Sequence, residues 1–286
     1  MLKSLKQARA AFSMLNAQEL SSRANRPVHI GLVSTGGTGF AEMEQFLVPA
    51  GLPEERRAQP LKMVHRAGDP DAPPEVDLVL YEEGIPASKG TYTFHPQEPA
   101  ATVQQILHGN DDIHLPLARH FAAFRRPVVD AIIQTVAKEN AVFAIATALP
   151  DVIPNLVELP WALGEWASDT AFLTANQIRM AFQISAVCGK EVGFTHQKAE
   201  VLSIAAGAFG WRALARELVG KIPLGGGLIP KGAIAYAGTV VVGKVLERVH
   251  HAEMAYTTDE KRGLYADALD RGRQVAATLI PGLRES

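Results

Sequence analysis

The chain has little cysteine, few aromatic side chains and no excess of charge of either sign. Its 286 residues include one cysteine and 7% aromatic residues, and its formal net charge is −2. A single thiol, Cys188, excludes an intrachain disulfide framework and a metal cage of several thiolates, and we expect it to be a small apolar residue. The small net charge provides no field for attracting a nucleic acid, so we expect no nucleic-acid partner.

Long uninterrupted apolar runs are also missing. Residues 139–166 are largely apolar, but polar residues and prolines interrupt them, so they cannot form an ordinary spanning helix of about 20 apolar residues. The second stretch, 228–246, is clean only between Lys231 and Lys244, which is typical of a buried core helix or an interfacial segment. A third stretch, 201–211, is similar. The three stretches have tryptophans near their edges or small residues that would let helices approach closely, in a membrane or in a soluble core. These residues are Trp161, Trp166, Trp211, Gly207, Gly210, Gly232, Ala233, Ala237, Gly238 and Gly243.

The pattern of short apolar runs predicts an N-terminal helix and then a small α/β region. Residues 1–25 form an amphipathic stripe, which would pack on the protein or lie on a membrane surface. Short strands are predicted where apolar residues end at glycine or proline turns, and a helix is predicted at 39–51 between the first two. The strand candidates are 26–35, 61–67, 76–83 and 91–96.

From about residue 102 the pattern changes to long helical segments broken by proline and glycine. Helices are predicted at 102–108, 113–124, 127–148, 156–188 with an interruption, 196–220, 230–256 and 258–279. The predicted fold class is therefore α/β plus all-α. We expect an α/β module at 26–112 and a helical domain with apolar, glycine-rich helices at 113–286.

The stretch "GLVSTGGTG" has the frame of a phosphate-binding loop. Gly31 and Gly36 are separated by four residues, and Gly37 and Thr38 follow. Such a loop surrounds phosphate with backbone N–H groups, neutralises it with a lysine and binds magnesium through a Ser or Thr hydroxyl. Gly37 stands where the lysine belongs, so the loop keeps the backbone and hydroxyl positions and lacks the cation.

The order strand, loop, helix and three further strands resembles a compressed Ras-like or Era-like GTPase domain. In that family an Asp-x-x-Gly motif follows the next strand, and here the sequence reads "HRAG", with His65 in place of the aspartate and Gly68 retained. The guanine-reading Asn-Lys-x-Asp motif is replaced by "HPQE", residues 95–98, and the region "LPEERRAQP" is too short for a normal switch loop. The resemblance therefore implies a degenerate GTPase-like module with a vestigial phosphate loop, no catalytic residue and no metal ligand.

The helical half carries a second resemblance. The segments "FLTANQIRMAFQISAVCGKEV", "GAFGWRALARELVGKIP" and "IPKGAIAYAGTVVVGKVLE" resemble, in order and spacing, the uncharacterised bacterial domain family of YcjF-like proteins. That family is found C-terminal to Era-like GTPase domains and is often predicted to be membrane-associated. The resemblance implies an architecture and a membrane association, without a reaction or a ligand.

Four polar groups in the helical half could have other roles. Two basic clusters could face anionic lipid or solvent. Adjacent histidines on a helix point about 100° apart and cannot easily share one metal ion, so the pair at 250–251 is expected on a solvated face. Polar residues on the apolar helix near 176 suggest a buried hydrogen-bond network or a helix contact. The groups are Arg119, His120, Arg125 and Arg126; Arg212, Arg216 and Lys221; His250, His251 and Glu253; and Asn176, Gln177 and Arg179.

The sequence favours a non-catalytic, pseudo-GTPase-like protein with a scaffolding or regulatory role. Its expected partners are membrane lipid or partner helices, with a homo-oligomer as an option, and its expected location is the cytoplasmic face of the cell membrane, or alternatively the cytoplasm. No cofactor is expected. Two alternatives stay open: a GTP- or ATP-binding enzyme with an atypical phosphate loop, and a soluble helical interaction module.

Overall fold

The computed structural model of the chain describes residues 17–147, 169–204 apart from 194 and 202, 228–252 and 256–279. The predicted helix at 1–25 falls partly within this range, as α2, Ala17–Asn25. Several sequence-based predictions lie outside the described residues, and they stay predictions. They concern residues 1–16, the apolar segment 148–163, the glycines at 207 and 210, the three tryptophans, the basic residues at 212–221 and Glu253.

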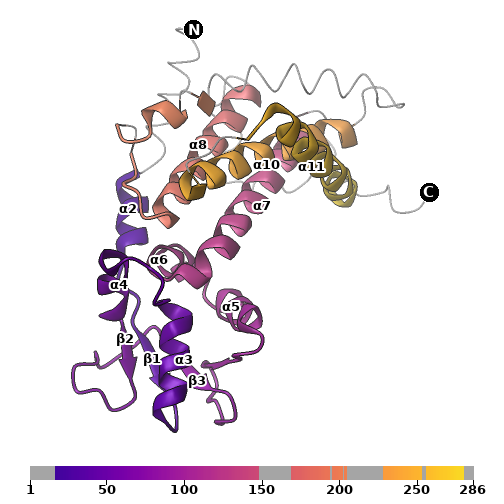
Figure 1. Cartoon of the computed structure of the whole chain (residues 1–286). Coiled ribbons are helices and arrows are strands. Elements are labelled where there is room, and N and C mark those ends of the chain that lie inside the picture. The colour runs from indigo at the N-terminus through magenta and orange to yellow at the C-terminus, as the bar shows by residue number, and fades with distance from the viewer. Residues whose placement is uncertain are drawn as a thin grey trace. The chain divides into compact units, whose positions relative to one another are not determined.

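Four short strands form one parallel sheet in the order β2-β1-β3-β4 (Figure 1). β1 is the central strand that precedes the glycine-rich loop, and it pairs with β2 on one side and with β3 on the other. All four strands fall within the segments predicted from the sequence, and the mixed α/β and helical character is confirmed. Their bounds are β1 Ile30–Val33, β2 Val64–Arg66, β3 Leu78–Glu82 and β4 Tyr92–Phe94.

The helices around the sheet bury a narrow apolar face against it. In α3, Gly37–Leu47, the buried residues Gly39, Met43 and Leu47 recur every four positions, so they share one face. α4, Glu54–Leu61, lies in a segment for which the sequence predicted only a short loop. Acidic residues in the first turn after Pro53 are typical of a helix start, but the segment is so polar that no apolar periodicity indicated a helix. The remaining helices are α5 Pro99–His108 and α6 His114–His120.

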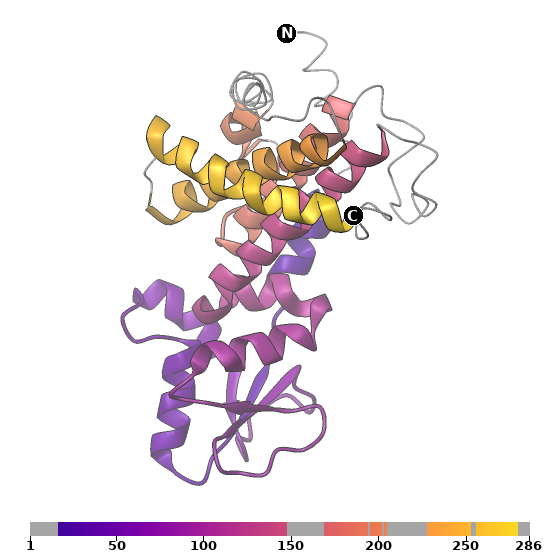
Figure 2. The same cartoon turned by 90° about the vertical axis from the view of Figure 1, so that its right-hand side faces the viewer.

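The helical part contains four long helices among the residues described. α10 and α11 lie side by side in both views (Figure 1 and Figure 2). α10 is buried around most of its circumference between residues 232 and 240, as expected for a helix whose apolar residues show little segregation to one side. The helices are α7 Ala122–Ala146, α8 Asp169–Val187, α10 Leu228–Ala252 and α11 Thr258–Leu279.

The chain separates into two compact units. One contains 21–129 and 186–190, and the other contains 1–20, 130–185 and 191–286. The division therefore falls inside α7, which contributes to both units, whereas the sequence placed the end of the α/β module at residue 112. The first helices after the sheet, α5 and α6, belong with the strands because their apolar residues, such as Val103 and Leu117, are buried in the same unit.

Candidate functional site

The glycine-rich loop lies at the carboxyl edge of the sheet, between β1 and β3. From β1 the chain continues to β2 on one side, and from β3 it continues to β4 on the other side. In open parallel sheets this reversal creates a crevice outside the carboxyl ends of the strands, which is the usual place for a ligand. The predicted phosphate loop therefore occupies the position where the topology would place a binding site.

The carboxylate of Glu82, the last residue of β3, fills the anion position of this loop. Its Oε2 accepts hydrogen bonds from the Ser34 hydroxyl at 2.7 Å, from the Thr35 backbone N–H at 3.0 Å and from the Thr35 hydroxyl at 3.3 Å. The Ser34 hydroxyl lowers the pKa of Glu82 most, followed by the Thr35 N–H, because these donors favour the charged form. The loop is thus closed by a negative charge from the chain itself.

The glycine that makes room for this carboxylate is Gly39. A Cβ at Gly39 would lie 2.4 Å from Cδ of Glu82 and 2.5 Å from Oγ of Ser34. By contrast, a Cβ at Gly36 or Gly37 would meet nothing within 4 Å. Gly36 has extended backbone angles of −157° and 168°, which any residue can adopt. The packing requirement for glycine therefore falls on Gly39 rather than on the positions that define the motif.

The other predicted loop residues take simpler positions. Gly31 lies within β1, where a Cβ would make an ordinary 3.4 Å contact with Cγ2 of Val76. Gly37 and Thr38 are exposed on the first turn of α3. The strand, loop and helix of the motif are therefore present, and the side chain of Thr38 is accessible to solvent.

His65, which stands at the aspartate position of the Asp-x-x-Gly motif, does not contact the loop residues that hold Glu82. It lies within β2, opposite Gly31 in the register, and its Nε2 is 2.9 Å from Nδ1 of His29, which precedes β1. Gly68 follows in a turn with a φ of +85°, where glycine avoids the steric cost of a Cβ. The retained glycine is therefore explained by the backbone of the turn.

The "HPQE" segment completes the carboxyl edge. His95 follows β4, and its Nδ1 lies 2.8 Å from Oε1 of Glu83. Its backbone N–H donates to the Thr102 hydroxyl at 3.0 Å, and Glu98 precedes the first turn of α5. These residues connect β4 to β3 and α5, and the side chains of Gln97 and Glu98 are exposed.

Two arginines of the first basic cluster stabilise the end of α8. Arg119 donates to the carbonyls of Ala186 at 2.7 Å and Lys190 at 3.2 Å, and Arg125 donates to the carbonyl of Val187 at 3.3 Å. Burial lowers the pKa of both guanidinium groups. The expectation that they face lipid or solvent was wrong for these two residues, because the carbonyls at a helix C-terminus attract cations.

The remaining members of that cluster differ from each other. Nε2 of His120 lies 3.1 Å from the carbonyl oxygen of Arg26, and burial lowers the pKa of His120. Arg126 is exposed, as the sequence reading allowed.

The predicted buried polar network in the helical part is confirmed. Nδ2 of Asn140 donates to the Thr239 hydroxyl at 2.8 Å, and Nδ2 of Asn176 donates to Oδ1 of Asn140 at 2.9 Å. Gln177 reaches the same hydroxyl at 3.5 Å, and Arg179 pairs with Glu139. The network joins α7, α8 and α10 through side chains that are at most 4% exposed at Asn140, Asn176, Gln177 and Thr239.

The glycines of α10 produce the close helix contacts that their spacing predicts. A Cβ at Gly243 would lie 2.6 Å from Cγ1 of Ile133, and a Cβ at Gly232 would lie 2.7 Å from Cδ1 of Ile145. Both isoleucines belong to α7. Ala233 and Ala237 of the same helix are fully buried.

His250 does not lie on a solvated face, so that prediction was wrong. Its side chain is 5% exposed, and its Nε2 lies 3.1 Å from the Ser185 hydroxyl and 3.8 Å from Oε1 of Glu200. The helix turns this position toward α8, which the sequence spacing alone does not reveal. Within the described residues, no group of three or more His, Cys, Asp or Glu side chains could hold a metal ion. Cys188 is half-buried just beyond the end of α8.

The one residue that decides the state of the loop, Glu82, was missed by the sequence analysis. Its signal was present, since Glu82 and Glu83 directly follow an apolar strand, and the ends of adjacent parallel strands meet at one edge. No protein-family model matches the sequence, and neither a curated protein nor a solved structure gives a significant match. The two family resemblances therefore stay predictions.

Proposed function

We propose that the chain is a non-catalytic, pseudo-GTPase-like protein with a scaffolding or regulatory role. The observation that carries this proposal is the Glu82 carboxylate on the Ser34 and Thr35 donors. A phosphate in the same place would have to displace this carboxylate or lie beside its negative charge. The loop has no lysine to offset that repulsion, because Gly37 occupies the position.

The order of the parallel strands supports the GTPase-like part of the proposal. The loop follows a central strand and leads into a helix, which is the arrangement that phosphate-binding folds use. Two motif positions, one within β2 and one after β4, carry the histidines His65 and His95, whose ring nitrogens contact His29 and Glu83. The strand order therefore fits a phosphate-binding fold, while the polar side chains at the motif positions contact other residues of the same chain.

Calorimetric titration with GTP or ATP in the presence of Mg²⁺ tests this part. The wild-type protein is expected to show no binding at micromolar nucleotide, and Thr38→Ala is expected to behave in the same way. Micromolar affinity that falls in Thr38→Ala would contradict the pseudo-GTPase proposal and favour the alternative, a nucleotide-binding enzyme with an atypical phosphate loop.

For the helical part we propose association with the cytoplasmic face of the cell membrane, through lipid or partner helices. Among the residues described, one helical segment, Ile229–His250, is long and apolar enough to cross a membrane. Just over half of its apolar window, 56%, is buried within the chain. The resemblance to YcjF-like proteins points in the same direction.

A soluble helical interaction module is the second candidate, and the contacts of α10 favour it. Thr239, in the middle of the candidate span, hydrogen-bonds to Asn140, and Lys244 pairs with Asp130 and Glu247. α11 lies along α10 and carries acidic and basic residues from Asp259 to Arg273. Insertion of α10 in a bilayer would require Asp130 of α7 and the charged residues of α11 to separate from α10.

Cell fractionation distinguishes the two candidates. Membrane association predicts that the protein sediments with membranes in high-speed centrifugation and is released by detergent. Recovery in the supernatant without detergent would contradict it and support the soluble module. Flotation of the purified protein with anionic vesicles separates a lipid partner from a protein partner, because only lipid binding moves the protein upward with the vesicles.

A further inference from the structure

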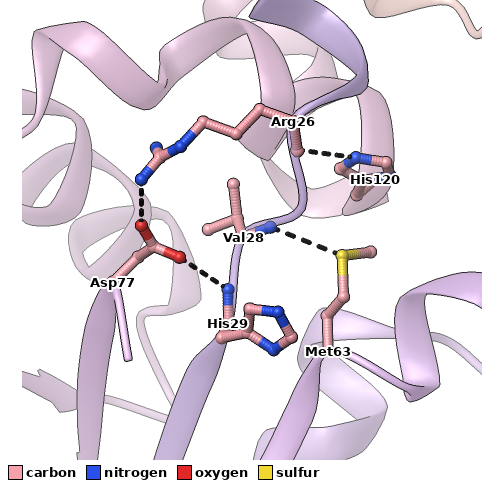
Figure 3. A network of polar contacts seen from close by, with 6 residues as sticks. All are labelled: Arg26, Val28, His29, Met63, Asp77 and His120. Carbon is pink, nitrogen blue, oxygen red and sulfur yellow. Dashed lines mark hydrogen bonds and ion pairs between the residues drawn. The ribbon is translucent and has the colours of Figure 1, made fainter. Parts of the chain in front are cut away.

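The segment that leads into β1 is held by polar contacts from several parts of its own unit (Figure 3). Nη2 of Arg26 donates to Oδ1 of Asp77 at 2.5 Å, and the backbone N–H of His29 donates to Oδ2 of the same carboxylate at 2.8 Å. Nε2 of His120 donates to the carbonyl of Arg26 at 3.1 Å, and the N–H of Val28 donates to Sδ of Met63 at 3.4 Å. Asp77 thus fixes both ends of a four-residue segment.

A contact between two histidines connects this segment to β2. Nδ1 of His29 lies 2.9 Å from Nε2 of His65, and the rings are stacked with centroids 5.2 Å apart. His65 is 8% exposed. A neutral imidazole has one N–H and one lone pair, so this hydrogen bond exists only while one of the two facing nitrogens is unprotonated.

Charged side chains lie close to the two rings. Oδ2 of Asp69 lies 3.8 Å from Nδ1 of His65. Asp77 is already engaged with Arg26 and the His29 backbone, and Arg66 pairs with Glu44 at 2.7 Å. If both facing nitrogens carried a proton, two N–H groups and two positive charges would face each other across 2.9 Å, which is a hydrogen-bond distance.

His120 adds to the same acid sensitivity. Burial lowers its pKa below the ordinary value of 6.5. The unfolded chain therefore binds a proton at this position more readily than the folded chain, so stability decreases as pH falls below about 6.5 toward the folded value. Protonation of His120 and loss of the His29–His65 hydrogen bond would therefore both lower the stability of this unit as pH falls.

We propose that the His29–His65 contact is an acid-sensitive latch between β1 and β2, which opens when the pair takes up its second proton. The latch is independent of the proposed pseudo-GTPase role, since it acts at the amino end of β1 and needs no ligand. Histidine is the side chain whose charge changes between about pH 5 and 8, so a comparison of two pH values within this range tests the latch.

Hydrogen–deuterium exchange of the full chain at pH 7.5 and 5.5 tests the latch. Protection of peptides covering 26–34 and 60–68 is corrected for the intrinsic pH dependence of exchange with an unstructured reference peptide, and a chelator is present throughout. The wild-type peptides are expected to lose about tenfold in corrected protection at pH 5.5, the change that one proton produces over one pH unit. Peptides of α10 are expected to change less.

The variant that removes titration is His29→Asn with His65→Gln. The Asn and Gln amides place a donor or acceptor near the original ring nitrogens, and neither takes up a proton in this range. His120 remains in this double variant, so we expect a loss of about threefold in corrected protection, against about tenfold in the wild type. The matched control is His108→Gln, an exposed histidine on α5 of the same unit, which is expected to behave like the wild type.

Two outcomes would overturn the proposal. One is equal corrected protection of the wild-type peptides at the two pH values, and the other is a double variant that loses as much protection as the wild type. If the double variant does not fold at pH 7.5, His65→Gln alone replaces it, because the pair then has a single titrating member. The same two outcomes apply to that variant.

Discussion

The carboxyl edge of the sheet and the interior of the helical part both engage polar side chains within the chain, but in different surroundings. Glu82 lies at a surface where Thr35 and Gly36 are exposed, and its donors come from a loop. Asn140 and Thr239 are fully buried among helices. Water can replace a lost partner at the sheet edge, whereas a buried group without its partner bears the full cost of desolvation. Similar hydrogen bonds should therefore differ in their effect on stability.

The largest effect is expected from Asn140→Leu. This substitution removes the shorter of the two hydrogen bonds that the Thr239 hydroxyl accepts and leaves Asn176 without its acceptor, so we expect the free energy of unfolding to fall by about 2 to 4 kcal/mol. Denaturant unfolding followed by circular dichroism measures the loss. The control is Lys231→Ala, an exposed position on α10, with an expected change within about 0.5 kcal/mol. Equal stabilities of the two variants would contradict a buried role for the network.

A somewhat smaller effect is expected from Gly243→Ala. The new Cβ would lie 2.6 Å from the buried Ile133 of α7, so we expect a loss of about 1 to 3 kcal/mol from overpacking. Gly263→Ala is the matched control, since its Cβ would meet nothing within 4 Å on α11. That control should gain about 0.5 to 1 kcal/mol through its higher helix propensity. A stabilising Gly243→Ala would show that α7 and α10 do not pack as closely as described.

Glu82→Gln is expected to have a smaller effect than either helical variant. The Gln amide oxygen can still accept from Ser34 or Thr35, but it loses the charge that strengthens these hydrogen bonds. Because the pKa of Glu82 is lowered in the folded state, its contribution is present above the unfolded value of 4.5 and is lost as pH falls through the folded value. Melting temperatures between pH 7 and pH 3 should therefore depend less on pH in the variant. Glu83→Gln is the control at the neighbouring position, and an identical response from both variants would argue against a special role for Glu82.

The smallest effect is expected at the start of α11. The backbone N–H of Thr257 donates to Glu260 at 2.7 Å and the N–H of Glu260 donates to the Thr257 hydroxyl at 3.2 Å, which together form a capping box. The Thr257 N–H contributes most to lowering the pKa of Glu260 to about 2. Stability from this group should be lost as pH falls from 4.5 toward about 2, and Glu260→Ala should abolish that part of the pH dependence. The same titration of Asp259→Asn serves as the control, and a pH profile unchanged in Glu260→Ala would refute the capping role.

The sequence patterns predicted where strands and helices form, and they were less successful at predicting which residues of different elements are in contact. The four strands followed from short apolar runs ended by turn residues, and the polar positions at 176 and 177 correctly indicated a buried network. Arg119 and His250 were misread because their partners, Ala186 and Ser185, are more than 60 residues away in the chain. A single helix face gives no information about which distant element covers it.

The glycine-rich loop illustrates the difference between local patterns and long-range contacts. From the sequence one can conclude that a strand, a glycine-rich turn and a helix follow one another and that no lysine follows Gly36, because these are local properties of backbone and composition. The fold is needed to see that Glu82, 48 positions beyond Ser34, accepts hydrogen bonds from the loop and that Gly39 makes room for it. The parallel pairing of β1 with β3 brings these residues to one edge, and that pairing is a long-range property of the fold.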